Sequence, residues 1–62
     1  MQEEAIERLK SRYSGMKATV IRDTTGSGLL GLPKGWVLVN ISRDDGTIKL
    51  QAGVSPEGRV HT

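Results

Sequence analysis

The chain has 62 residues, a formal net charge of +2 and no cysteine. A chain this short forms one domain at most and buries only about 60% of the surface that its unfolded form exposes. Small domains are usually supported by disulfides, a structural metal or association, and with no cysteine and a single histidine, His61, only association remains. The same composition argues against an enzyme, because the chain is too small to enclose a water-free cleft. We therefore expect no catalytic residue, cofactor or metal site.

Charge and hydropathy indicate where the protein works. No run approaches the ~18 apolar residues of a membrane span, and the acidic start is unlike the basic start of a signal peptide. We expect a cytoplasmic or virion-associated protein without membrane contact. The acids and bases of residues 1–15 cancel, so the positive surplus belongs to residues 16–62. That surplus is mild and is weak evidence for a nucleic-acid partner.

Residues 1–14 have the pattern of one amphipathic helix. Ile6, Leu9 and Tyr13 recur at helical spacing beside Ala5. Acids fill the first turns and bases the last, in agreement with the helix macrodipole, and Gly15 is a suitable stop. A helix of this length is marginal alone in water, so its apolar stripe must pack on another surface.

From residue 16 onward the hydrophobic period changes to two, and β-branched residues predominate. Three strands are predicted, over residues 18–21, 36–41 and 47–52. Asp45-Gly46 predicts a two-residue type I′ hairpin turn, which sets Ile41 opposite Leu50; by the same register Val39 faces Ala52 and Val37 faces Val54. A four-residue loop over residues 43–46 is the alternative and preserves the same apolar face.

The opposite face of this hairpin carries Trp36 and Leu38, so the strand is apolar on both sides. Such a strand is covered on both sides, here by the helix stripe or by a second subunit. Ser55-Pro56-Glu57-Gly58 is typical of a type I turn, which allows residues 59–62 to return as a short last strand. The predicted architecture is a single α+β domain, with a helix (1–15) packed on a β-rich body (16–62) of three to five antiparallel strands, either a small sheet or a partly open barrel.

The segment 23–35 interleaves four glycines with Leu29, Leu30 and Leu32. One interpretation is that Leu30 and Leu32 enter the core, and the other is an apolar binding loop or subunit contact. Gly26 to Gly31 formally matches the dinucleotide-binding pattern, but no helix can follow it before the hairpin. The glycines are therefore expected to serve tight backbone geometry.

Positive side chains distributed over the predicted strands and turns are the candidate nucleic-acid contacts. A row of cations on a β scaffold can follow a phosphate backbone, although lysine on an edge strand also protects against unwanted pairing. Trp36 and Tyr13, the only aromatic rings, are expected to pack internally, so no stacking platform is predicted. The candidate nucleic-acid-binding residues are Lys17, Arg22, Lys34, Arg43 and Lys49.

Two partial family resemblances are present. Residues 17–22, Gly26-Ser27-Gly28 and Leu32-Pro33-Lys34 resemble the opening half of AbrB and MazE type swapped-hairpin DNA-binding proteins, and residues 45–50 are similar to their closing strand. The helix that follows the Pro-Lys step in that family is absent from this sequence. This resemblance implies that Arg22 and Lys34 face DNA. The long glycine loop and the hairpin also resemble small Src-homology-type barrels, which implies a ligand surface at that loop and Trp36.

Two functions follow as hypotheses. The first is a small non-catalytic module that binds nucleic acid or regulates through a basic β surface. The second is an interaction or assembly subunit, for example of a phage particle, that contacts itself or a larger assembly. The protein-interface residues for the second hypothesis are Leu29, Leu30, Leu32, Trp36 and Leu38.

Overall fold

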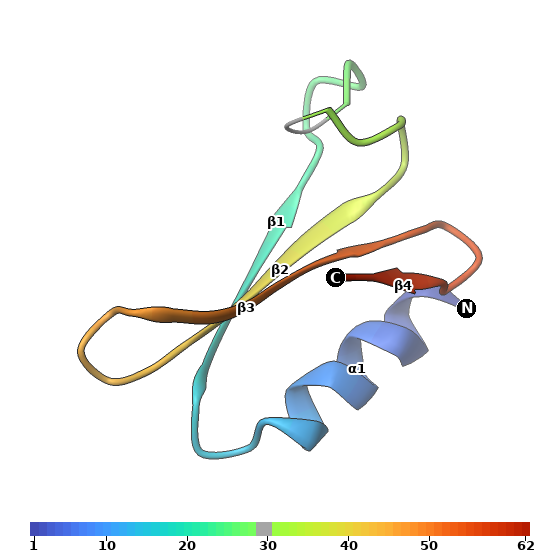
Figure 1. The fold of residues 1–62 in the computed structure, drawn as a ribbon. Helices are drawn as coiled ribbons and strands as arrows, with labels where there is room; N and C mark the ends of the chain where they lie inside the picture. The colour runs from blue at the N-terminus through green and yellow to red at the C-terminus, as the bar shows by residue number, and fades with distance from the viewer. Residues whose placement is uncertain (29–30) are drawn as a thin grey trace.

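The fold is one helix on one side of a four-stranded sheet (Figure 1). The computed structural model describes residues 1–28 and 31–62. The elements are α1 (Gln2–Arg12), β1 (Lys17–Arg22), β2 (Val37–Ser42), β3 (Ile48–Val54) and β4 (Val60–His61). The strands are antiparallel in the order β1-β2-β3-β4, and the sheet is open. The predicted α+β architecture is confirmed in its sheet form.

Helix α1 packs through the predicted stripe. Ala5, Ile6 and Leu9 are buried, and Tyr13, the C-cap, is half-buried against the core. The helix ends at Arg12, two residues earlier than predicted, and the chain turns toward β1 across Gly15. The apolar spacing therefore identified both the element and the face that it buries.

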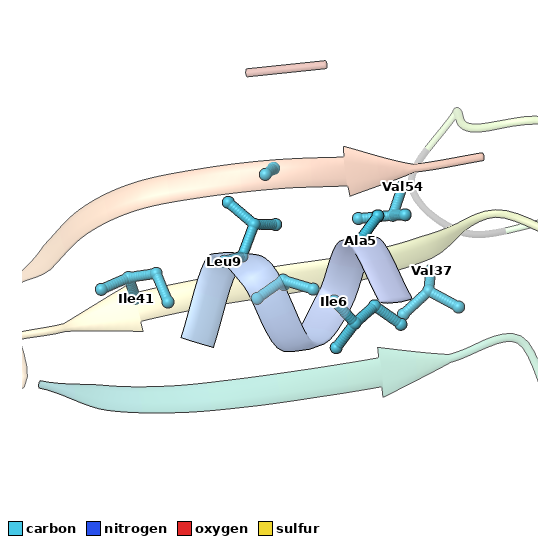
Figure 2. Close-up of a cluster of buried hydrophobic side chains, with 8 residues drawn as sticks. Ala5, Ile6, Leu9, Val37, Ile41 and Val54 are labelled. Carbon is cyan, nitrogen blue, oxygen red and sulfur yellow. The ribbon is translucent and has the colours of Figure 1, made fainter. Parts of the chain in front are cut away.

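The core lies between α1 and the near face of the sheet. Val39, Ile41 and Val54 are 0–1% exposed, and Ile6 is 2% exposed. Figure 2 shows the helix side chains among those of β2 and β3. Because strand side chains alternate between the two faces, this packing fixes which residues of each strand face away from the helix.

The β2–β3 hairpin has the predicted register but a different turn. Val37↔Val54, Val39↔Ala52 and Ile41↔Leu50 pair as expected. The two-residue turn was wrong: the Arg43 N–H donates to the Thr47 carbonyl (2.8 Å), which leaves a three-residue loop with Gly46 at φ +89°. The longer loop arises because the Asp45 carboxylate accepts the Thr47 N–H (2.9 Å) that the shorter turn requires. A register shift then leaves Lys49 without a partner and restores the expected pairing of the strands.

The second face of the hairpin is covered by the chain's own loop. A Cβ on Gly53 would lie 3.3 Å from Leu32 Cδ2 and 3.3 Å from Trp36 Cε3, so both side chains lie directly on this glycine. Leu38, the cross-strand neighbour of Gly53, is only 5% exposed. At this end of the sheet the covering element is the loop before β2 and not α1, whereas coverage by a second subunit stays a prediction. The missing side chain at Gly53 makes the space that the loop fills.

The predicted turn and last strand are confirmed. The Gly58 N–H donates to the Ser55 carbonyl (2.9 Å), and residues 60–61 pair with β3. Gly58, at φ +97°, lies against the backbone of Met1, whose carbonyl oxygen would be 2.8 Å from an added Cβ. The Gln2 side chain donates to the carbonyls of Gly35 (2.7 Å) and Val54 (3.3 Å). These contacts hold the start of α1 against one end of the sheet. The helix lies on one face of the sheet, and no helix covers the other face within the described residues.

Candidate functional site: the helix-free face of the sheet

The candidate site is the face of the sheet that points away from α1, which we call the open face. Figure 1 shows the helix on one side of the sheet only. Alternation and register place the same set of positions on this face along all four strands. The open face comprises Lys17, Thr19 and Ile21 of β1, Leu38, Asn40 and Ser42 of β2, Ile48, Gln51 and Gly53 of β3, and His61 of β4.

The two ends of the open face differ in chemistry. At the loop end, Trp36 packs on Gly53 and its ring centroid lies 5.2 Å from that of His61, at an interplanar angle of 56°. In the middle, the Gln51 amide donates to the Asn40 side-chain oxygen (2.9 Å). Thr19 lies beside Asn40 on β1. The face thus runs from an apolar, internally packed end to a polar band formed by Thr19, Asn40 and Gln51.

Three of the five predicted nucleic-acid-binding residues meet at the hairpin end, beyond the polar band. Lys17 pairs with Ser42, whose chain neighbour is Arg43, and Lys49 is the unpaired residue at the start of β3. All three side chains are exposed, and none forms an ion pair within the described chain. We call Lys17, Arg43 and Lys49 the cationic end.

Two acids share this hairpin turn. Asp45 accepts a hydrogen bond from the Thr47 N–H, and this bond is the main reason that its pKa is lowered from 3.8. Asp45 therefore stays ionised at neutral pH, and its carboxylate is directed to the turn backbone. Asp44 is exposed beside it. The cationic end carries three positive charges against these two negative ones, so any attraction for phosphate is local and short-ranged.

The other two predicted cations lie elsewhere. Arg22 is at the opposite end of β1 and faces the helix, where its guanidinium contacts the Glu3 carboxylate at 2.9 and 3.0 Å. These hydrogen bonds lower the pKa of Glu3 and raise that of Arg22, so the charge of Arg22 is already compensated. Lys34 is exposed in the loop before β2, at the same end of the sheet. Neither residue joins the cationic end.

The predicted protein-interface residues are mostly engaged within the chain. Leu38 is buried, and Leu32 and Trp36 are half-buried on Gly53. Leu29 and Leu30 lie outside the described residues. Among the described residues, the large apolar side chains that remain exposed are different ones: Met1 at 81%, Ile48 at 52%, Val60 at 42% and Ile21 at 36%.

The glycine-rich segment is organised around Asp23, a residue that sequence reasoning did not single out. One carboxylate oxygen accepts from the N–H groups of Thr25 (3.1 Å) and Gly26 (2.9 Å), and the other accepts from Gly28 N–H (2.7 Å). These bonds, that of Gly28 above all, lower the pKa of Asp23 from 3.8. An aspartate two and three residues before such donors is a known turn-forming arrangement, and Asp23-Thr24-Thr25-Gly26 carries that signal. The N–H groups of Thr25, Gly26 and Gly28 are thus occupied by the chain's own carboxylate and are not free to bind a phosphate.

A shallow groove of about 950 Å³ runs between α1 and the last strand. Its walls come from charged helix residues of both signs and from the apolar Ala5 and Leu9, together with Gly58 and Val60. None of the predicted site residues lines it. The mixed charge gives this groove no preference for an anionic or a cationic ligand.

Comparisons with protein-family models, curated proteins and solved structures found no match. No helix in the described part of the chain is long and apolar enough to cross a membrane.

Proposed function

We propose that the protein is a non-catalytic nucleic-acid-binding module whose open face contacts the phosphate backbone through its cationic end. The observation that carries the proposal is the placement of Lys17 and Lys49 at one end of a face that no helix covers, with Arg43 in the adjoining turn. These cations come from three separate segments and have no ion-pair partner in the described chain. Exposed cations that form no ion pair release condensed counterions from nucleic acid when they bind phosphate.

The polar band next to the cationic end adds hydrogen-bonding groups. Because the Asn40 oxygen already accepts from Gln51, the free groups of this pair are the Asn40 amide hydrogens and the Gln51 oxygen. Such groups can reach sugar and base edges once the phosphates are held. Trp36 is packed on Gly53, so base stacking contributes little. We therefore expect binding through the backbone, with little sequence preference.

The salt dependence of binding tests this proposal. A fluorescence-anisotropy titration with labelled random-sequence DNA gives the association constant at several salt concentrations. Three phosphate contacts predict a slope of log K against log salt of about −2.7 for duplex DNA and about −2 for a single strand. A slope near zero, or no binding at low salt, would overturn the proposal.

A matched pair of variants separates local contact from net charge. Lys17→Ala/Arg43→Ala/Lys49→Ala removes the cationic end, and we expect its slope to fall close to zero. The control removes three cations from the helix, at Arg8, Lys10 and Arg12, and changes the net charge equally. We expect the control to retain the slope of the unmodified protein, provided that circular dichroism shows both variants folded. Equal loss in both variants would mean that net charge alone attracts the DNA.

An assembly subunit is the second candidate function. The exposure of Ile48 and Val60 supports it, because isolated apolar side chains of this size gain from burial in a contact. An apolar contact between proteins depends only weakly on salt, whereas binding to nucleic acid weakens steeply as salt rises. Association of the protein with itself or with an assembly that persists in high salt would therefore favour this second function.

A further inference from the structure

Strand β1 leaves one edge of the sheet open over six residues. Within residues 1–28 and 31–62 it lies first in the strand order, and β2 is the only strand with which it pairs. An edge strand exposes a row of unpaired N–H and C=O groups, which natural proteins usually protect with charges, proline, a bulge or a short length. The pairing of β1 with β2 is regular throughout, and its centre, Ala18-Thr19-Val20-Ile21, carries no charge and no proline. The opposite edge of the sheet, in contrast, is a strand of only two residues.

The residues of this edge are complementary to themselves. When two antiparallel strands are related by a twofold axis perpendicular to the sheet, each side chain stays on its own face, so opposed residues are an even number of positions apart. An axis at Val20 places Val20 against Val20 of the second copy, on the helix side of the sheet. It also places Thr19 against Ile21 of the second copy, on the open face.

The positions of the charged residues favour the register with its axis at Val20 over the register with its axis at Thr19. With the axis at Val20, Lys17 lies opposite Asp23 of the second copy, one residue beyond the end of β1, and symmetry repeats this approach of opposite charges at the other end. The Asp23 oxygens keep their hydrogen bonds to the loop, and Lys17 stays exposed on the open face. With the axis at Thr19, Lys17 would instead lie opposite Ile21, and no opposite charges would meet. Arg22 adds no unpaired charge to the contact, because Glu3 of its own chain already compensates it.

We propose that two copies of the chain associate through their β1 edges, centred on Val20, to form one continuous eight-stranded sheet. The contact completes the backbone hydrogen bonds of the edge and covers Ile21, which is 36% exposed in the single chain. Both open faces then lie on the same side of the sheet, with the two Lys17 residues about 20 Å apart along the strand direction. A contact of one strand per copy is smaller than a standard stable interface. We therefore expect an equilibrium that dilution shifts to the monomer.

Cysteine cross-linking tests the register directly, because the chain has no cysteine of its own. With the axis at Val20, Val20→Cys brings two directly opposed Cα atoms to about 5 Å, within disulfide range. Thr19→Cys and Ile21→Cys each leave their equivalent Cα atoms about 8 Å apart, which is too far. Under mild oxidation in the absence of nucleic acid, we expect a covalent dimer from Val20→Cys and at least several-fold less from the other two. Preferential linkage through Thr19→Cys would overturn the register.

Sedimentation equilibrium tests the association itself. The unmodified protein should show a mass that rises from monomer toward dimer with concentration. Ile21→Lys places a charge on the contact and should keep the protein monomeric, whereas the matched control Ile48→Lys changes the same residue type away from the β1 edge and should not. A monomer at every concentration, or equal loss of dimer in both variants, would overturn the proposal. Neither readout involves DNA, so this proposal and the nucleic-acid proposal can fail independently.

Discussion

The packing of Leu32 and Trp36 on Gly53 predicts a large effect of a small substitution. Gly53→Val introduces a Cβ that would lie 3.3 Å from both side chains, and its two methyl groups extend further into the same space. Overpacking of this kind lowers the free energy of unfolding by about 1–3 kcal/mol. Replacing glycine by a β-branched residue in a strand raises it by up to ~1 kcal/mol. The net expectation is a loss of about 1–2 kcal/mol in the free energy of unfolding.

Thermal unfolding and tryptophan fluorescence measure this effect together. For a domain of this size, such a loss lowers Tm by about 5–15 °C. Trp36 is the only tryptophan, and its emission should shift to the red as its ring is displaced into water. Gln51→Val is the control, because it places the same side chain on the same strand and face without that contact and removes only one exposed hydrogen bond to Asn40. A Gly53→Val protein with unchanged Tm and unchanged emission would refute the claim that the loop covers this face.

Two further predictions concern the loop and the last turn. Because the loop N–H groups hold the pKa of Asp23 below 3.8, the carboxylate stabilises the fold above that pH and loses this contribution as pH falls through the lower, folded value. Tm of Asp23→Asn should therefore fall less on acidification than Tm of the unmodified protein. The control is Asp44→Asn, and an equal reduction of the acid-induced fall in that variant would contradict the assignment to Asp23. Gly58→Ala should cost at least ~1 kcal/mol more than Gly15→Ala in denaturant unfolding: both have positive φ, but only Gly58 lies against the Met1 backbone. Equal losses would show that the close approach is unimportant.

The sequence predicted those features of the fold that depend on periodicity. The spacing of Ile6 and Leu9 identified the buried face of the helix, and the alternation around Val39 identified the buried face of the hairpin. Turn geometry was less predictable, because the Asp45 side chain competes for the backbone donor that the shorter turn needs. An offsetting shift beside Lys49 then restored the expected pairing. The face on which a strand residue lies is thus more reliably predicted than the length of the hairpin loop.

The candidate site was only partly predictable. Residue type indicated which cations could contact phosphate, but a count of charges cannot show that Lys17 and Lys49 meet at one end while Arg22 is turned toward Glu3. That difference depends on strand pairing and on where α1 packs. The loop contact on Gly53 was also missed, since a glycine in a strand does not show which side chains fill the space above it.

Two-dimensional NMR of the ¹⁵N-labelled protein, titrated with a short DNA duplex at low salt, tests the central claim most directly. A chain of 62 residues gives resolved amide signals, so the contact surface can be mapped residue by residue. Binding through the open face predicts perturbations at Lys17, Thr19 and Asn40, and from Arg43 to Lys49, that reverse when salt is raised. Unperturbed spectra, or perturbations confined to α1, would contradict the account.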